Sequence, residues 1–256
     1  METDQKYNNM ERIDNTGFGD LKLIQDPEEF CYGIDAVLLA DFTADFAKQE
    51  RLRAAAGAVK ALDFCTGTGV VPLILSYKTN WHITGVEIQA HSYELAEKMV
   101  KLNGLSERLD FIRDDVKALT ADKMGEFDVI SMNPPYTEAK AGLVCEDDAK
   151  LIARHETTAA LEDFMKAASR LLKDKGDFFM IHKPSRLTDI FEYGRKYKLE
   201  PKELRMVVPS EGKAANLVLV HLVKNGGRQL KVLEQIAVRN EDGTYTEMIN
   251  ECYDRR

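Results

Sequence analysis

Residues 62–73 read Leu-Asp-Phe-Cys-Thr-Gly-Thr-Gly-Val-Val-Pro-Leu, and this stretch decides the fold class. An apolar strand ends at Asp63, small residues follow, and apolar residues then recur at helical spacing. Gly67 and Gly69 would let the backbone approach a ligand closely. The stretch is neither a dinucleotide fingerprint nor a phosphate-binding loop, because no glycine lies three residues after Gly69 and no Lys-Ser/Thr pair follows. It therefore predicts a strand, a ligand-binding turn and a helix, as in an α/β domain.

Three further predicted strands also end in polar residues. Glu87 closes the strand that begins at Trp81, and a doubly wound sheet has its ribose-binding carboxylate at about this distance from the turn. Asp115 lies in the polar end of the strand stretch at 109–116, and Asn133 follows the strand at 127–132. Any one of these residues could be a solvated strand end. Ligands of open α/β sheets bind outside the carboxyl ends of the strands, so four polar ends in register indicate one site.

The fourth strand ends in Asn133-Pro134-Pro135-Tyr136. Proline lacks an N–H and has a fixed φ, so two prolines end the strand and hold the preceding residue extended. The Asn133 side-chain oxygen and the Pro134 carbonyl can each accept one N–H of a planar –NH₂ group. We expect the ring of Tyr136, rather than its hydroxyl, to be used for stacking on the attached π system. By itself, the tetrapeptide fits equally well a turn that buries a tyrosine.

Together, these features resemble the S-adenosylmethionine-dependent methyltransferases with a Rossmann-like fold, over about residues 30–224. The tetrapeptide resembles the motif of amino-methyltransferases, which modify exocyclic or amide nitrogens. The implied fold is α/β, with a mainly parallel seven-stranded sheet, helices on both faces and an antiparallel C-terminal hairpin. The implied cofactor is S-adenosyl-L-methionine.

The resemblance also implies roles for individual residues. Asp63 and the turn at 66–69 would hold the methionine end of the cofactor, Glu87 would accept hydrogen bonds from the ribose hydroxyls, and Asp115 would face the adenine amine. The implied cofactor-binding residues are Asp63, Cys65, Thr66, Gly67, Gly69, Glu87, Ile88, Asp115, Val116 and Asn133. The implied catalytic residues are Asn133, Pro134, Pro135 and Tyr136.

Three other segments are similar to a narrower family, the bacterial valine-tRNA adenine-37 N6-methyltransferases. They are Phe-Cys-Tyr-Gly-Ile-Asp-Ala-Val-Leu-Leu-Ala at 30–40, Ala-Arg-His-Glu at 153–156 and Asp-Gly-Thr-Tyr-Thr-Glu at 242–247. This resemblance implies methyl transfer to the N6 amine of adenine in RNA, with tRNA position 37 as the expected target. The candidates for substrate contact are Tyr32, Asp35, Arg154, Lys183, Arg186 and Lys213.

Composition is compatible with an RNA-modifying enzyme, although the net charge of −8 alone argues against nucleic-acid binding. Residues 183–213 carry eight Lys or Arg against five Asp or Glu, a local positive excess that is also typical of a solvated helix surface. No apolar run is long enough to span a membrane, and the N-terminus lacks a signal-peptide pattern. The scattered cysteines and histidines predict no metal site, and we expect a cytoplasmic protein.

The chain divides into three predicted parts. Residues 1–57 form an N-terminal cap, with a short β element and a helix at 34–47. Residues 58–224 form the methyltransferase domain, and 225–256 form a small β extension. The charged stretch 137–156 is long for a connection in a compact domain, so we expect a lid that orders on substrate.

Three other functions remain open. Protein glutamine N5-methyltransferases use the same tetrapeptide on an amide, but they usually carry an N-terminal helical domain, and residues 1–60 are too short and too polar for one. A ribosomal RNA guanine-N2 methyltransferase is the second alternative. The third is a non-catalytic cofactor-binding protein, which an intact Asn-Pro-Pro-Tyr motif disfavours. The sequence does not indicate the oligomeric state.

Overall fold

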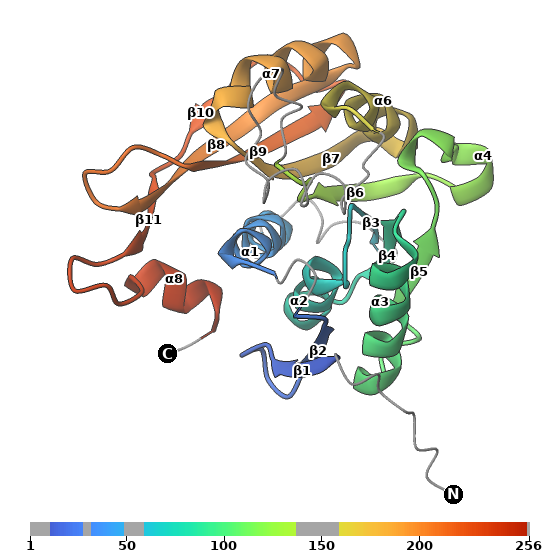
Figure 1. Ribbon diagram of the computed structural model, residues 1–256. Helices are drawn as coiled ribbons and strands as arrows, with labels where there is room; N and C mark the ends of the chain where they lie inside the picture. The colour runs from blue at the N-terminus through green and yellow to red at the C-terminus, as the bar shows by residue number, and fades with distance from the viewer. Residues whose placement is uncertain (1–10, 28–31, 49–58, 137–158, 255–256) are drawn as a thin grey trace, which may run out of the picture.

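The computed structural model describes residues 11–27, 32–48, 59–136 and 159–254. Within these ranges, nine strands form one sheet in the order β10-β8-β9-β7-β6-β3-β4-β5, and β11 also pairs with β8 (Figure 1). Their bounds are β3 Lys60–Phe64, β4 His82–Glu87, β5 Leu109–Arg113, β6 Phe127–Met132, β7 Leu172–His182, β8 Leu199–Ser210, β9 Leu217–Lys224, β10 Lys231–Val232 and β11 Ile236–Arg239.

Strands β3 to β7 run parallel to one another, and β9 runs antiparallel to both β7 and β8. The expected seven-stranded sheet with a C-terminal hairpin is therefore confirmed as the part of the sheet from β8 to β5. The short strands β10 and β11 extend it, because both pair in parallel with β8.

Helices cover both faces of the sheet (Figure 1). One face carries α1 (Ile34–Lys48), α2 (Val70–Lys78) and α3 (Ala90–Asn103), and the other carries α4 (Ala121–Met124), α6 (Leu161–Leu171) and α7 (Leu187–Lys196). The strands supply both layers because successive side chains point to opposite faces. In β3, Ala61 belongs to the core cluster under α1–α3, while Leu62 and Phe64 belong to the cluster under α6 and α7.

The two ends of the described chain meet on the α1–α3 side. An antiparallel hairpin of β1 (Arg12–Asn15) and β2 (Lys22–Gln25) lies near α8 (Glu247–Cys252). The ring of Phe18 in the hairpin stacks on Tyr253 at 5.7 Å between centroids. The Asn103 side-chain amide bonds both the N–H and the carbonyl of Lys22, which fixes the hairpin to the end of α3. The predicted cap and extension thus share a core with the central domain.

Local rules explain the clearest boundaries. Helix α3 ends at Asn103, because Gly104 adopts a left-handed conformation with φ 64° at its C-cap. None of the described helices is long and apolar enough to cross a bilayer.

The predicted lid at 137–156 lies outside the described residues.

Candidate cofactor and acceptor site

The predicted cofactor-binding and catalytic residues lie at the carboxyl ends of neighbouring strands. Because β3 pairs with both β4 and β6, the chain reverses its direction of winding at β3. Phe64 is in register with Met132, so the turn after β3 and Asn133 after β6 are adjacent. Such a switch point is where open α/β sheets bind ligands. The structure therefore brings together the residues that the polar strand ends predicted.

Asp63 is a buried acid at this edge, with 1% of its surface exposed. Its side chain accepts a hydrogen bond from the Ser131 hydroxyl on the adjacent strand at 2.5 Å. Burial raises the pKa of Asp63 from 3.8 to about 7, against the opposing effect of the Ser131 bond. A buried carboxylate favours a cationic partner, which would return its pKa toward the ordinary range. Asp63 therefore suits the predicted role at the amino-acid end of the cofactor.

The turn after β3 is built for close approach to a ligand. Cys65, Gly67 and Gly69 have φ values of 54°, 56° and 85°, in the left-handed region. A Cβ on Gly69 would lie 2.7 Å from the Phe111 ring, so the side of the turn that faces the core has no room for a side chain. A Cβ on Gly67 would meet nothing within 4 Å, which leaves space on its open side. The turn thus presents bare backbone toward that space.

Glu87 fixes the shape of this turn. Its carboxylate accepts hydrogen bonds from the backbone N–H groups of Gly67 at 2.8 Å, Ile88 at 2.9 Å and Gln89 at 3.0 Å. Only 6% of the residue is exposed. A carboxylate has about four acceptor positions, so three backbone bonds leave capacity for a hydroxyl. The residue fits a ribose-binding role, and it also ties the β3 turn to the end of β4.

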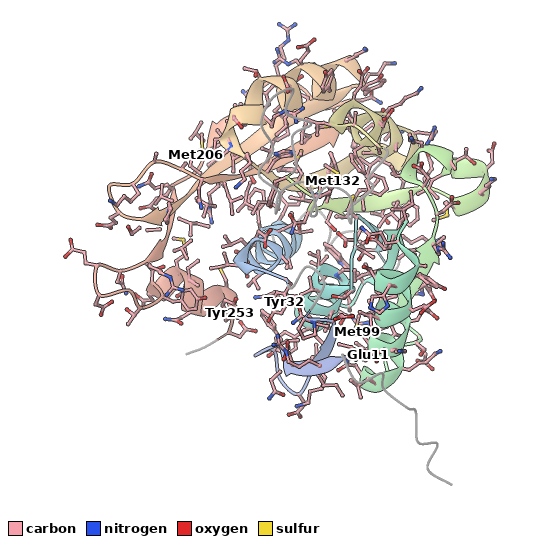
Figure 2. The ribbon with its side chains drawn as sticks, viewed as in Figure 1. Glu11, Tyr32, Met99, Met132, Met206 and Tyr253 are labelled. Carbon is pink, nitrogen blue, oxygen red and sulfur yellow. The ribbon has the colours of Figure 1, made fainter. Side chains whose placement is uncertain are left out.

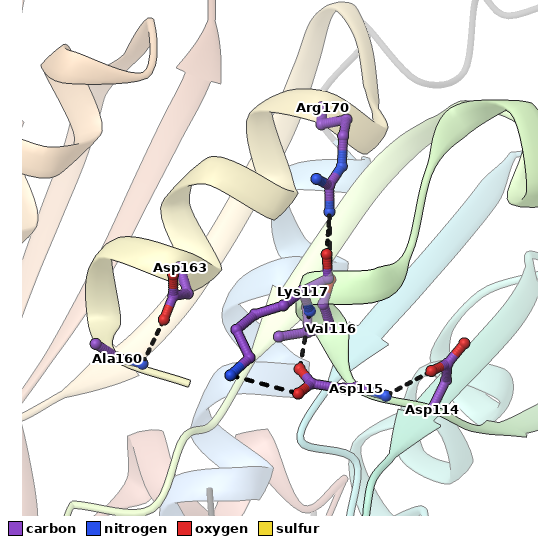
Figure 3. A network of polar contacts seen from close by, with 7 residues as sticks. All are labelled: Asp114, Asp115, Val116, Lys117, Ala160, Asp163 and Arg170. Carbon is purple, nitrogen blue, oxygen red and sulfur yellow. Dashed lines mark hydrogen bonds and ion pairs between the residues drawn. The ribbon is translucent and has the colours of Figure 1, made fainter. Parts of the chain in front are cut away.

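The loop after β5 is held from two sides (Figure 3). Asp115 accepts from the backbone N–H of Lys117 at 2.9 Å, and the Lys117 ammonium lies 3.5 Å from the same carboxylate. Arg170 on α6 donates to the carbonyl of Lys117 at 3.2 Å. Val116 is buried in the core under α6. The contacts of Asp115 and Val116 with an adenine ring remain predictions.

Asp35 joins the acceptor motif from the first turn of α1. Its Oδ2 lies 3.1 Å from Asn133 Nδ2, which donates to it, and 3.1 Å from the Tyr136 hydroxyl. The same hydroxyl lies 2.8 Å from Asn133 Oδ1, so its single proton can be donated to either oxygen. Burial and the Asp35 charge raise the pKa of Tyr136 well above its usual range. The use of the Tyr136 ring for stacking stays a prediction, and the structure adds that the hydroxyl of this residue contacts Asp35 and the Asn133 amide.

This arrangement sets the direction of the Asn133 side chain. With Nδ2 held by Asp35, Oδ1 is the remaining acceptor, and a carbonyl oxygen has two lone pairs. The hydroxyl of Tyr136 uses one lone pair at most, so the other can accept an N–H from a substrate amine. The expected contact of Asp35 with substrate stays a prediction, and in the structure Asp35 contacts Asn133 and Tyr136 of the acceptor motif.

Two residues at the end of β7 complete the surroundings of Tyr136. The His182 ring lies 5.6 Å from the Tyr136 ring, edge to face, and the Lys183 ammonium lies over that ring at 5.2 Å. Lys183 was among the candidates for substrate contact, whereas no sequence pattern pointed to His182. The signal that points to His182 is its position, because it is the last residue of the strand parallel to β6.

The other substrate candidates lie in different places. Arg186 follows in a short 3₁₀ helix, η2 (Pro184–Arg186), and pairs with Asp189 at 2.6 Å. Lys213 is exposed in the turn between β8 and β9, and Arg154 is outside the described residues. Tyr32 lines a separate pocket of about 430 Å³ between the hairpin and the C-terminal segment, where Figure 2 labels it together with Tyr253.

Among the described residues, no cluster of His, Cys, Asp and Glu could hold a metal ion.

Comparison with known proteins agrees with this geometry. A family model described as methyltransferase small domain matches residues 49–190. In fold, the chain is similar to a predicted O-methyltransferase from Agrobacterium tumefaciens (TM-score 0.66, 19% identity, 87% of this chain and 96% of that one). It is also similar to Pyrococcus horikoshii TYW2 in complex with MeSAdo (TM-score 0.56, 13% identity, 86% of this chain and 73% of that one).

Named relatives narrow the comparison. The tRNA1(Val) (adenine(37)-N6)-methyltransferase of Porphyromonas gingivalis is 30% identical, over 68% of this chain and 67% of its own length. The protein of the same name from Aeromonas hydrophila is 28% identical, over 73% of this chain and 78% of its own.

The fold and the strand-end site define an S-adenosylmethionine-dependent methyltransferase. More narrowly, the chain belongs to the methyltransferase small domain family, within the bacterial tRNA1(Val) (adenine-37-N6)-methyltransferase group. The predicted enzyme class, cofactor and fold are thereby confirmed.

Proposed function

We propose that this enzyme transfers a methyl group to the N6 amine of adenine in RNA, at position 37 of a tRNA anticodon loop, and that it acts in the cytoplasm. The observation that carries this proposal is the Asp35–Asn133–Tyr136 arrangement, which holds one amide oxygen ready for a planar –NH₂ group. The names of the relatives support adenine 37 of tRNA as the target.

The residues of the chain account for the main requirements of the transfer. S-adenosylmethionine, when bound, supplies an activated methyl group. Asp63, the turn at 65–69 and Glu87 would hold it, and the acceptor amine would bond Asn133 Oδ1 and the Pro134 carbonyl. These two acceptors orient the amine and stabilise the positive charge that develops on its nitrogen. The proton can leave after the transfer, so no side chain has to act as a base.

The surrounding residues suit an unstacked base. Flipping a base out of an RNA loop costs a few kcal/mol, and stacking on an aromatic ring returns about 1–3 kcal/mol. The Tyr136 ring is half-buried and held by its hydroxyl, so it is a fixed stacking surface. Lys183 and Lys213 are exposed at the same edge of the sheet, where phosphates of the loop can be bound.

The test is methyl transfer from labelled S-adenosylmethionine to a transcribed tRNA1(Val). Label should enter the transcript with adenine at position 37 and should not enter a matched transcript with guanine there. Asn133→Ala should lower turnover at least 100-fold and leave cofactor affinity within a few-fold, because the side chain faces the acceptor. Labelling of a release-factor protein instead of tRNA would favour the glutamine-modifying alternative and contradict the proposal.

A further inference from the structure

His182 lies next to the acceptor motif without a role in the mechanism described above. It is the last residue of β7, and Met180 of that strand is in register with Met132 of β6. His182 comes two residues after Met180, and Pro134 comes two residues after Met132. His182 and Pro134 therefore lie at the same level at the carboxyl edge of the sheet. The His182 ring lies 5.6 Å from the Tyr136 ring, with an angle of 61° between their planes. A base stacked on Tyr136 would thus have His182 beside its edge.

The hydrogen bonding of His182 fixes which nitrogen carries its proton. The backbone N–H of Lys183 donates to Nδ1 at 2.7 Å, so Nδ1 is an acceptor and the proton of the neutral ring is on Nε2. Only 6% of the residue is exposed, and this burial, together with the positive charges of Arg186 and Lys183, lowers its pKa to about 4, against the opposing charge of Asp189. At neutral pH the ring is therefore an uncharged donor through Nε2.

The Nε2 atom has no hydrogen-bond partner among the described residues. The His182 ring, which carries Nε2, packs against the Tyr136 ring of the acceptor motif. An unpartnered N–H donor next to a stacking surface can bond an acceptor on the edge of a base. By contrast, Nε2 of His221 on β9 bonds Asp177 at 3.0 Å.

We propose that His182 Nε2–H donates a hydrogen bond to the ring nitrogen beside the target amine, and so reads the edge of the adenine. In adenine, both nitrogens near the N6 amine, N1 and N7, are acceptors without a proton. In guanine, the N2 amine lies between N3, which is an acceptor, and N1–H, which is a donor and would oppose His182. The inference rests on the proposed function and adds a specificity-determining residue to it.

The test changes one atom of the base and one residue of the protein. Transcripts would carry adenosine, 1-deazaadenosine or 7-deazaadenosine at position 37, and kcat/KM would be measured for the wild type, His182→Leu and His182→Gln. With adenosine, His182→Leu should lose about tenfold, the scale of one hydrogen bond together with an unpaired polar group. His182→Gln should retain most activity, because its amide N–H₂ can take the place of Nε2–H.

The decisive comparison is between the wild type and His182→Leu on the deaza bases. The wild type should lose about tenfold on one of the two, and on that base His182→Leu should show no further loss. Differences in reactivity between the bases cancel, since each base is compared across the same proteins. Equal loss by His182→Leu on all three bases would overturn the inference. Cofactor affinity and melting temperature establish folding, and His182→Gln keeps the test valid if the leucine variant does not fold.

Failure of this inference can be told apart from failure of the proposed function. If the wild type methylates adenine 37 but shows no coupling between His182 and either nitrogen, the inference alone is wrong. If the wild type does not methylate the adenine transcript, the proposed function is wrong and the inference falls with it.

Discussion

Asp35→Ala tests how the acceptor site is held together. The substitution removes the acceptor of the Asn133 Nδ2 hydrogen bond and one of two possible partners of the Tyr136 hydroxyl. Both distances are 3.1 Å, long for a bond to a carboxylate, and the hydroxyl can turn to Asn133 Oδ1 at 2.8 Å. The loss should therefore be close to that of one charged hydrogen bond, about 2 kcal/mol or roughly 30-fold in kcat. Cofactor affinity should change by less than threefold.

Two further variants sharpen the test. Asp35→Asn keeps the shape, but because Oδ1 accepts from the backbone N–H of Ala36, its amide group would face the Asn133 donor. It should be no better than Asp35→Ala. Asp45→Ala is the matched control, since Asp45 is exposed on the same helix. Titration calorimetry gives cofactor affinity, and single-turnover transfer to tRNA gives the rate.

Two results would refute the reasoning. If Asp35→Ala folds and transfers methyl groups at the wild-type rate, the contacts of Asp35 do not orient Asn133. If it loses cofactor affinity as much as turnover, Asp35 supports the cofactor half of the site instead. Tyr136→Phe provides an independent check, because Asp35 still holds the amide in that variant, so its loss should be only a few-fold.

Two predictions concern the cofactor half. Glu87→Ala should weaken S-adenosylmethionine binding at least tenfold in calorimetry, because the predicted bond to the ribose and the bond to Gly67 are both lost; a folded variant with unchanged affinity would contradict the ribose assignment. For Asp63, a pKa raised from 3.8 to about 7 means that the folded protein holds the proton more tightly than the unfolded chain. Its stabilising contribution is complete below about pH 4 and is lost as the pH rises through about 7. Asp63→Asn should remove this loss in thermal melts of the cofactor-free protein, and identical pH profiles of the two proteins would count against the raised pKa.

The cofactor half could be predicted from the sequence because its chemistry is local. An acid, a turn with Gly67 and Gly69, and a second acid at the end of the next strand follow one another within 25 residues of chain. Parallel strands in one sheet place their carboxyl ends together, so sequence order was enough to assemble these residues. The structure then adds what depends on packing, such as the contact with Phe111 that leaves no room for a side chain at Gly69.

The acceptor half could be predicted only in part. The tetrapeptide at 133–136 is local, but its partner Asp35 is 98 residues away on a helix before the sheet. The Ser131–Asp63 bond likewise depends on strand register, because the two strands are 68 residues apart. His182 reads as an ordinary strand residue until β7 is placed beside β6. No periodicity or spacing rule specifies such contacts, since they arise from the order of strands rather than the order of residues.

The cofactor half and the acceptor half of the site are built from different kinds of contact, and this difference indicates which residues determine specificity for the acceptor amine. The cofactor half is made by turns that follow β3 and β4, and its geometry is fixed by backbone bonds to Glu87. The acceptor half depends on side chains from α1, β6 and β7 that meet only in the folded protein. A change at Asp35 or His182 can therefore alter which amine is presented without disturbing the cofactor. Variants of these two residues should therefore change kcat/KM for RNA, whereas the cofactor affinity of each variant should equal that of the wild type.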